Sequence, residues 1–358
     1  MSFRHTLISA IVALAALAAP AAAAANPALV FSHVTTETQG TETVAKGGLF
    51  AARGEHVTSL TDNPADTEPA FSPDGDTIVF SRGGDLFKIR PDGTGERQLT
   101  GGPEVDSRPL VSRDGRTIVF ERAAAPGAPR DLYTVGVDGG NTHFLVTSAG
   151  DEHEATLSPN GKTVAFTRSE PEATGGTHDV IYSIRLNGSG IVRLSHGRED
   201  AFAPHYFAGG IVFDRGESSE GPSGFSDIYA TKANGAKPHR LVGGASSVYL
   251  QDISADGRTM LFSRYQSLCE KTIVGGKPHK IATMPAGIET QAAYSPDGRA
   301  VAVRTETYAP ADPAQRLYTL NTRQGFELGS LVSTEGSEAD SEEIGDYFAW
   351  QPGSRAGY

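Results

Sequence analysis

A short string of residues recurs along the chain, and this repetition constrains the fold more than any other feature of the sequence. Each copy reads close to Ser-Pro-Asp-Gly, and the copies occupy residues 72–75, 112–115, 158–161, 254–257 and 295–298. Proline presets the backbone dihedral of the second turn position, and glycine adopts the positive dihedral that ends a tight hairpin. We therefore interpret the string as a structural turn and not as a set of active-site residues.

Each turn is followed by an apolar run and then by a strand centred on an aromatic residue. The apolar runs lie at residues 77–80, 117–120, 163–166, 259–262 and 300–303, and residues 29–31 and 210–213 fit the same place in the repeat. The aromatic strands lie at 85–87, 131–133, 180–182, 227–229 and 316–318, with a weaker match at 271–274. With a closing strand in each unit, four strands recur at the spacing of propeller blades.

This pattern predicts an all-β fold, a single seven-bladed β-propeller of four-stranded antiparallel blades. Six blades are the alternative, because two of the units match the repeat least well. The first unit begins at its second strand, and residues 347–351 near the end of the chain supply a spare one. Pairing of this C-terminal strand with the N-terminal blade would close the ring and leave no open sheet edge, placing Trp350 in the core.

The first residues read as a targeting segment. Arg4 and His5 give a short basic start, residues 7–19 are almost entirely apolar, and Ala23 to Ala25 form a small-residue cleavage motif. We therefore predict a signal peptide at 1–25 and a propeller at 26–358, in a protein that is periplasmic or secreted. No apolar window is long enough for a membrane span after cleavage.

Charge and cysteine content narrow the classes of partner and of site. The formal net charge of −12 argues against a nucleic-acid partner and helps to keep the chain in solution, and we expect a monomer. Cys269 is the only cysteine, so no internal disulfide and no multi-cysteine zinc site can form. We expect Cys269 to be a small buried hydrophobic residue, and we predict no bound cofactor, with Ca²⁺ as an open alternative.

The Phe-Ser-Pro-Asp-Gly turn, the Ile-Val-Phe-Ser strand, the Asp-Leu-Phe or Asp-Leu-Tyr strand and the Gln-Leu-Thr ending at Thr100 together resemble the TolB-like β-propeller family, whose repeats are similar to WD repeats. The resemblance covers nearly the whole predicted mature chain. TolB itself carries an α/β domain before a six-bladed propeller, whereas these repeats begin close to the predicted cleavage site. The chain thus looks like a stand-alone member. Propellers of this kind also accompany prolyl oligopeptidases, but the Gly-x-Ser-x-Gly motif of their hydrolase domain is absent.

Strand parity assigns the connections to two faces. The short turns lie on one face of the propeller, and the long connections lie on the other, which we call the long-loop face. The long connections span residues 33–48, 123–130, 169–179, 216–226, 305–314 and 334–346. Loops on a rigid frame are where binding normally takes place, so we expect a protein or peptide partner on the long-loop face.

An acidic residue precedes each of five innermost strands on this face, and we take these as candidate ligand-facing acids: Asp66, Asp106, Glu152, Asp200 and Glu289. Gathered at the channel mouth, they would favour a cation or a basic segment of a partner. In the alternative, each carboxylate accepts a hydrogen bond within its own connection, as loop aspartates commonly do.

The sequence therefore predicts an exported, non-catalytic binding or scaffold propeller, with no catalytic, metal or cofactor residues assigned. Two alternatives stay open. One is a carbohydrate-active hydrolase or lyase with an acidic pocket at the channel mouth. The other is a propeller with a structural cation in its channel.

Overall fold

The computed structural model describes residues 28–352, apart from 40–41, 54–55, 141, 173–174, 198, 217–225, 245, 284–287, 308–314, 322–328, 334–341 and 351. The signal peptide predicted for residues 1–25 lies outside the described residues. Within the described part of the chain there are strands and turns and no helix, and so none long and apolar enough to cross a membrane.

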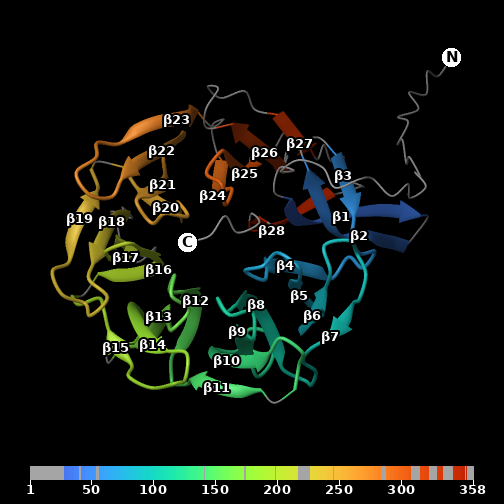
Figure 1. Ribbon diagram of the computed structural model, residues 1–358, viewed down its shortest axis with the longest axis horizontal. Coiled ribbons are helices and arrows are strands. Elements are labelled where there is room, and N and C mark those ends of the chain that lie inside the picture. Colours follow the sequence, from blue (N-terminus) through green and yellow to red (C-terminus); the bar gives the residue numbers. More distant parts are fainter. Residues whose placement is uncertain are drawn as a thin grey trace.

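The strands pair into four-stranded antiparallel sheets arranged around a central axis (Figure 1). We name each blade after its innermost strand. The β4 blade consists of β4 (Asp66–Phe71), β5 (Ile78–Arg82), β6 (Asp85–Ile89) and β7 (Arg97–Gln98). The β8 blade consists of β8 (Val105–Val111), β9 (Thr117–Ala123), β10 (Arg130–Gly136) and β11 (His143–Val146). The β12 blade consists of β12 (Asp151–Leu157), β13 (Thr163–Pro171), β14 (Thr177–Arg185) and β15 (Val192–Arg193).

The β16 blade consists of β16 (Asp200–Phe207), β17 (Gly210–Gly216), β18 (Ser226–Thr231) and β19 (His239–Val242). The β20 blade consists of β20 (Val248–Ile253), β21 (Thr259–Arg264), β22 (Ser267–Thr272) and β23 (His279–Thr283). The β24 blade consists of β24 (Ile288–Tyr294), β25 (Ala300–Thr307), β26 (Gln315–Asn321) and β27 (Gly329–Ser333).

The remaining sheet joins the two ends of the chain. It consists of β28 (Glu342–Trp350), β1 (Leu29–Gln39), β2 (Glu42–Arg53) and β3 (His56–Ser59), in that order. Leu29 pairs with Trp350 and Phe31 with Phe348, so the C-terminal strand closes the ring as the sequence predicted. Trp350 packs against the cluster around Leu29 and Phe31, and its indole N–H donates to the Ala293 carbonyl at 3.2 Å.

These pairings confirm an all-β propeller with four-stranded antiparallel blades. Among the described residues, six of the sheets each use four consecutive strands, and the β28 sheet, which joins the two ends of the chain, is the seventh four-stranded sheet.

The apolar runs are continuous because each second strand is covered on both faces by neighbouring blades. In β5, Ile78 and Phe80 pack toward β1 and β2, in a cluster with Val30 and Leu49. Val79, between them, packs toward the next blade in a cluster with Phe120. The same arrangement recurs around the ring, so the core is a series of interfaces between blades and not a single central cluster.

Two local expectations are corrected. The third strand of the β20 blade, expected at residues 271–274, is Ser267–Thr272, because a tight hairpin joins it to β21 with Arg264 paired to Ser267. Cys269 therefore pairs with Phe262, where the other blades have an aromatic residue, and it is buried as expected.

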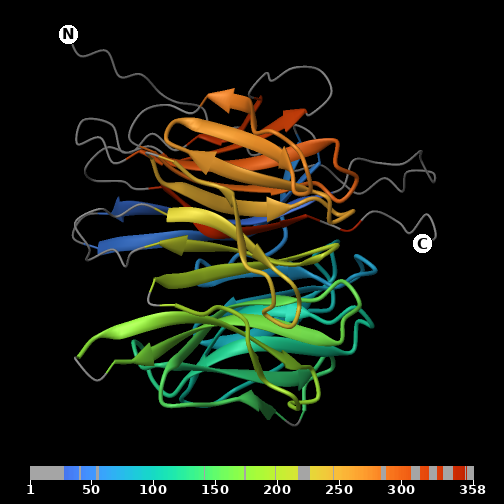
Figure 2. The ribbon, with the colours of Figure 1, turned by 90° about the vertical axis from the view of Figure 1, so that its left-hand side faces the viewer.

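The connections expected at 33–48 and 169–179 are instead largely strand, and the β1–β2 and β13–β14 hairpins project from the same side of the molecule (Figure 2).

Candidate functional site

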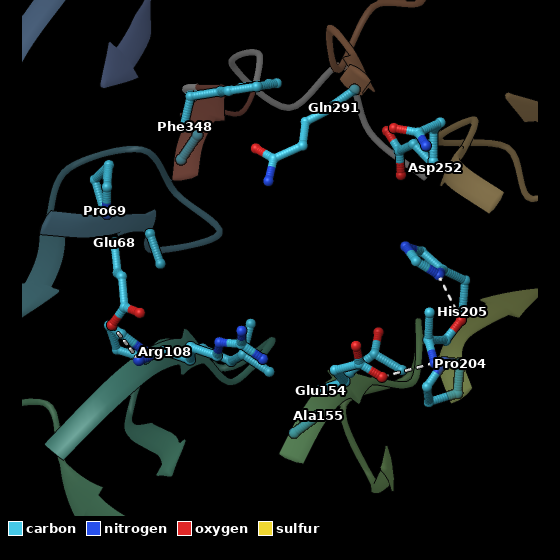
Figure 3. A pocket seen from close by; sticks show the side chains of 18 of the residues that line it. Glu68, Pro69, Arg108, Glu154, Ala155, Pro204, His205, Asp252, Gln291 and Phe348 are labelled. Carbon is cyan, nitrogen blue, oxygen red and sulfur yellow. Dashed lines mark hydrogen bonds between the residues drawn. The ribbon is translucent and has the colours of Figure 1, made fainter. Parts of the chain in front are cut away.

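A central pocket of about 700 Å³ is lined by residues from the innermost strand of every sheet (Figure 3). Pro69, Leu110 and Phe348 give it apolar walls. Its charged and amide side chains are Glu68, Arg108, Glu121, Glu154, His205, Gln251, Asp252 and Gln291. A concave, partly apolar pocket with a few convergent polar groups is the usual form of a ligand site.

A bulge in the innermost strands directs side chains toward this pocket. Glu68, Arg108, Glu154 and Ala203 occupy equivalent positions and have positive φ values of 54°, 50°, 52° and 50°. The strand register shifts at each of them. A positive φ is unfavourable for residues other than glycine, so each bulge must be held by surrounding contacts.

Hydrogen bonds between blades hold these bulges. Glu68 Oε2 accepts the backbone N–H of Arg108, in the next blade, at 2.7 Å, and the Ser81 hydroxyl of its own blade at 3.0 Å. Glu154 Oε2 likewise accepts the backbone N–H of Ala203 at 2.8 Å and the Thr167 hydroxyl at 3.0 Å. One carboxylate thus fixes both its own strand and the bulge of its neighbour.

Where the bulge residue carries no acceptor, the second strand supplies one. In the β8 blade the bulge residue is Arg108, and Glu121 on β9 accepts the backbone N–H of Glu154 at 2.8 Å. In the β16 blade the bulge residue is Ala203, and Asp214 on β17 accepts the backbone N–H of Leu250 at 3.0 Å. The side chain that accepts the hydrogen bond thus lies on the innermost strand in some of these blades and on the second strand in others. The hydrogen bond to the backbone of the next blade is present in all of them.

The β20 blade continues the arrangement with two acceptors. Gln251 Oε1 accepts the backbone N–H of Ala292 at 3.0 Å, and Asp252 Oδ2 accepts that of Tyr294 at 2.8 Å. The polar groups around the pocket are therefore fixed before any ligand arrives.

Burial changes the acidity of three of these carboxyl groups. Removal from water raises the pKa of Glu121, against the opposing effect of Arg108 and Arg130. It also raises the pKa of Asp214, whose carboxylate accepts the Leu250 amide, and the pKa of Asp252, where the charge of His205 opposes the shift. Of these three residues, Glu121 and Asp252 line the pocket.

Three of the acids nominated from the sequence form ion pairs within their own blades. Asp66 binds Arg82 through two contacts of 2.5 and 2.9 Å, and Asp106 binds Arg122 through two of 2.6 and 2.7 Å. Glu152 accepts from Arg168 at 2.7 Å.

Asp200 has a different role. Its Oδ1 accepts the backbone N–H of Asp179 at 2.9 Å and lies 3.0 Å from His178 Nδ1, both in the preceding blade. Glu289 lies on β24, and its side chain is outside the described residues. None of the four described acids lines the central pocket. That the five face a ligand stays a prediction.

The residues that do line the pocket were missed. Glu68, Arg108 and Glu154 each lie two positions after a nominated acid, and two of them precede a proline. An acid or arginine followed by proline, two residues after a repeated acid, could have indicated the bulge.

No group of three or more histidine, cysteine, aspartate or glutamate side chains is arranged to hold a metal ion within the described residues. The alternative of a bound Ca²⁺ stays a prediction.

Residues 33–204 match the family model of the TolB β-propeller domain. This stretch of the propeller is therefore similar to a TolB β-propeller domain. The match spans the blades from β1 to the start of β16, including Glu68, Arg108, Glu121 and Glu154 of the pocket. No curated protein matches the chain in sequence.

Solved structures share this propeller fold at low sequence identity. An oligogalacturonate lyase from Vibrio parahaemolyticus is 11% identical, with a TM-score of 0.61 over 83% of this chain and 92% of that one. TolB from Acinetobacter baumannii is 15% identical, with a TM-score of 0.51 over 89% of this chain and 83% of that one. A prolyl endopeptidase is 13% identical, with a TM-score of 0.58 over 88% of this chain but 50% of that one. At these identities the likeness concerns the fold, which hosts binding proteins and enzymes alike.

Proposed function

We propose that this TolB-like propeller is a non-catalytic binding protein, exported to the periplasm or beyond, that receives an extended segment of a protein or peptide partner at its central pocket. The observation that carries the proposal is the fixed state of the pocket. Glu68, Glu154 and Asp252 are each held by a backbone amide of the next blade. Groups fixed in advance lose little entropy on binding, which favours affinity.

The charge of the pocket indicates the chemistry of the segment. Four carboxyl groups line it, from Glu68, Glu121, Glu154 and Asp252, against one arginine, Arg108. Even with Glu121 and Asp252 protonated, the carboxylates of Glu68 and Glu154 outnumber the guanidinium of Arg108. A surplus of negative charge in a concave site favours a cation. We therefore propose that the bound segment carries a lysine or arginine side chain, with Pro69 and Phe348 contacting its apolar part.

The test uses fluorescein-labelled extended peptides that carry either lysines or glutamates at the same positions, with binding followed by anisotropy at low salt. The lysine peptide should bind the wild-type protein more tightly. Glu68→Gln should weaken it by about tenfold, because the charge is lost while the amide oxygen can still accept from Arg108 and Ser81. Exposed Asp62→Asn is the control and should change nothing. Equal affinity for both peptides, or no effect of Glu68→Gln, would contradict the proposal.

One observation favours a second candidate, an enzyme acting on acidic carbohydrate. Arg108, His205 and Asp252 line the same pocket, and the raised pKa of Asp252 is a property that general acids often show. Incubation with oligogalacturonates, followed by assay of new reducing and unsaturated ends, tests this candidate. Turnover that is lost in both His205→Ala and Asp252→Asn would replace the binding proposal. Without turnover, the binding proposal is retained.

A further inference from the structure

An arginine lies in the second strand of several blades, and in four of them it binds a carboxylate sixteen residues earlier in the chain. The pairs are Arg82 with Asp66, Arg122 with Asp106, Arg168 with Glu152, and Arg215 with Glu199. The arginine also lies over one or two aromatic rings of its blade, as Arg122 does over Phe120 and Tyr133. The repeat thus builds a slot that holds one carboxylate against a stacked guanidinium group.

The β20 blade has the arginine without the carboxylate. Arg264 pairs across the sheet with Val248, which lies sixteen residues earlier and is fully buried. The Arg264 Nε atom is buried and has no hydrogen-bond partner, and no ion pair of Arg264 occurs within the described residues. The guanidinium lies 5.9 Å from the centre of the Phe262 ring. A buried charged donor without an acceptor has an unfavourable free energy, so we expect an acceptor to bind at this position.

A second polar group without a partner lies at the same interface between blades. The Ser226 side chain is 4% exposed, and its hydroxyl is buried with no hydrogen-bond partner. Ser226 begins β18, and Val248 begins β20, so both lie at the long-loop end of their blades. The two strands pack together, since Ile228 and Val248 belong to one apolar cluster.

We propose that Arg264 binds a carboxylate that a ligand supplies, and that the Ser226 hydroxyl at the same interface between blades contributes to this site. The pairs in the β4 and β8 blades show which group fits: a carboxylate that receives two parallel N–H bonds from the guanidinium. Tyr265 is 83% exposed and Tyr249 is 44% exposed on the same blade. Tyrosine and arginine are both enriched at protein interfaces, so the ligand is an acidic segment of a protein partner.

This site is separate from the central pocket and does not depend on the function proposed for it. The two can be distinguished because they select peptides of opposite charge. Glu68→Gln should leave the binding of an acidic peptide unchanged, and Arg264→Gln should leave the binding of a basic peptide unchanged.

The experiment measures the anisotropy of a labelled glutamate-rich peptide and of its glutamine counterpart with the wild-type protein and three variants. The glutamate peptide should bind at least about tenfold more tightly than the glutamine peptide, and Arg264→Gln should abolish that preference. Val248→Glu should also abolish it, because the new carboxylate fills the slot from within, as Glu152 does for Arg168. Arg258→Gln alters an exposed arginine at the turn between β20 and β21, on the opposite face, and should bind like the wild type.

If Val248→Glu does not fold, the binding measured for Arg264→Gln alone tests the proposal. Equal affinity for both peptides, or an unchanged preference in Arg264→Gln, would overturn the proposal. A third arm uses oligogalacturonate, which carries carboxylates on a carbohydrate. Competition by this compound without binding of the glutamate peptide would overturn the assignment to a protein partner.

Discussion

The β8 and β20 blades share a strand plan and differ in the side chains around one arginine. In the β8 blade, Arg122 is held by Asp106 and lies over the rings of Phe120 and Tyr133. In the β20 blade, Arg264 faces Val248 and lies over the single ring of Phe262, because Cys269 takes the place of the second aromatic residue. The comparison shows that a blade can form without an ion pair between its first and second strands. In the β20 blade, the guanidinium of Arg264 is then available to bind a carboxylate from outside the blade.

The largest effect should come from breaking the pair where it exists. Asp106→Ala should lower the free energy of unfolding by about 3–5 kcal/mol, because Arg122 would lose the partner of a nearly buried charge. Urea denaturation measures the change. Asp138→Ala removes an exposed carboxylate that pairs with Lys88 and should leave the free energy of unfolding nearly unchanged, because solvent screens the pair. Equal effects of the two variants would mean that the pair does not stabilise the β8 blade.

In the β12 blade, the acid of the equivalent pair is Glu152, and the contribution of this acid to the free energy of unfolding should depend on pH. Burial raises its pKa to about 7, with Arg168 opposing the shift, and one carboxylate oxygen has no hydrogen-bond partner. The unfolded chain releases this proton near pH 4.5, whereas the folded protein holds it to about pH 7. The free energy of unfolding should therefore fall as pH rises through this interval, by up to about 3 kcal/mol.

Glu152→Gln should flatten this dependence, as measured by urea denaturation at a series of pH values. Asp62→Asn serves as the control and should keep the wild-type slope. A slope that persists in Glu152→Gln would assign the dependence to another group.

Replacing the second aromatic residue should make the β8 blade resemble the β20 blade. The Tyr133 ring packs against Phe120 and Phe144, with ring centroids 5.9 and 4.5 Å apart, and it contacts the guanidinium of Arg122. Tyr133→Cys should cost about 1–2 kcal/mol, because aromatic and cation–π contacts are lost from a half-buried site. Tyr133→Phe should retain most of that stability in the same denaturation measurement. If Tyr133→Phe instead lost most of the stability that Tyr133→Cys loses, the hydroxyl and not the ring would carry the effect.

The smallest effect should come from Arg264 itself. Arg264→Gln should change the free energy of unfolding by less than about 0.5 kcal/mol, because no ion pair is lost and an unpartnered buried donor is removed. Loss of stability comparable to that of Asp106→Ala would show that Arg264 stabilises the blade internally, and the carboxylate site would then have to be abandoned.

Much of the fold could be predicted because its causes are local. The Ser-Pro-Asp-Gly turns form through contacts within a few residues, such as the Ser72 hydroxyl to Asp74, and the apolar runs are legible as strands on their own. The third strand of the β20 blade was misplaced because Cys269 stands where the pattern needs an aromatic residue. Nothing nearby in the sequence marks the position of such a strand.

The candidate site was harder to predict because it depends on contacts between blades. Asp66 and Glu68 look alike in sequence, yet Asp66 turns to an arginine of its own blade while Glu68 holds the next blade and faces the pocket. Asp200 was grouped with Asp66 although it lies one position earlier in the repeat and binds the preceding blade. A bulge of one residue decides these roles, and the spacing of acids along the chain does not show it.

The pairing of β28 with β1 sets an order on the folding of the molecule. Leu29 finds its partner only when Trp350 is present, so the sheet made from both ends cannot be completed until almost the whole described chain is available. Contacts between residues so distant in sequence form slowly, because the entropy of closing the loop must be overcome first. Until then the edge of β1 that pairs with β28 is exposed to other chains, so the unfinished ring is open to association with them during synthesis.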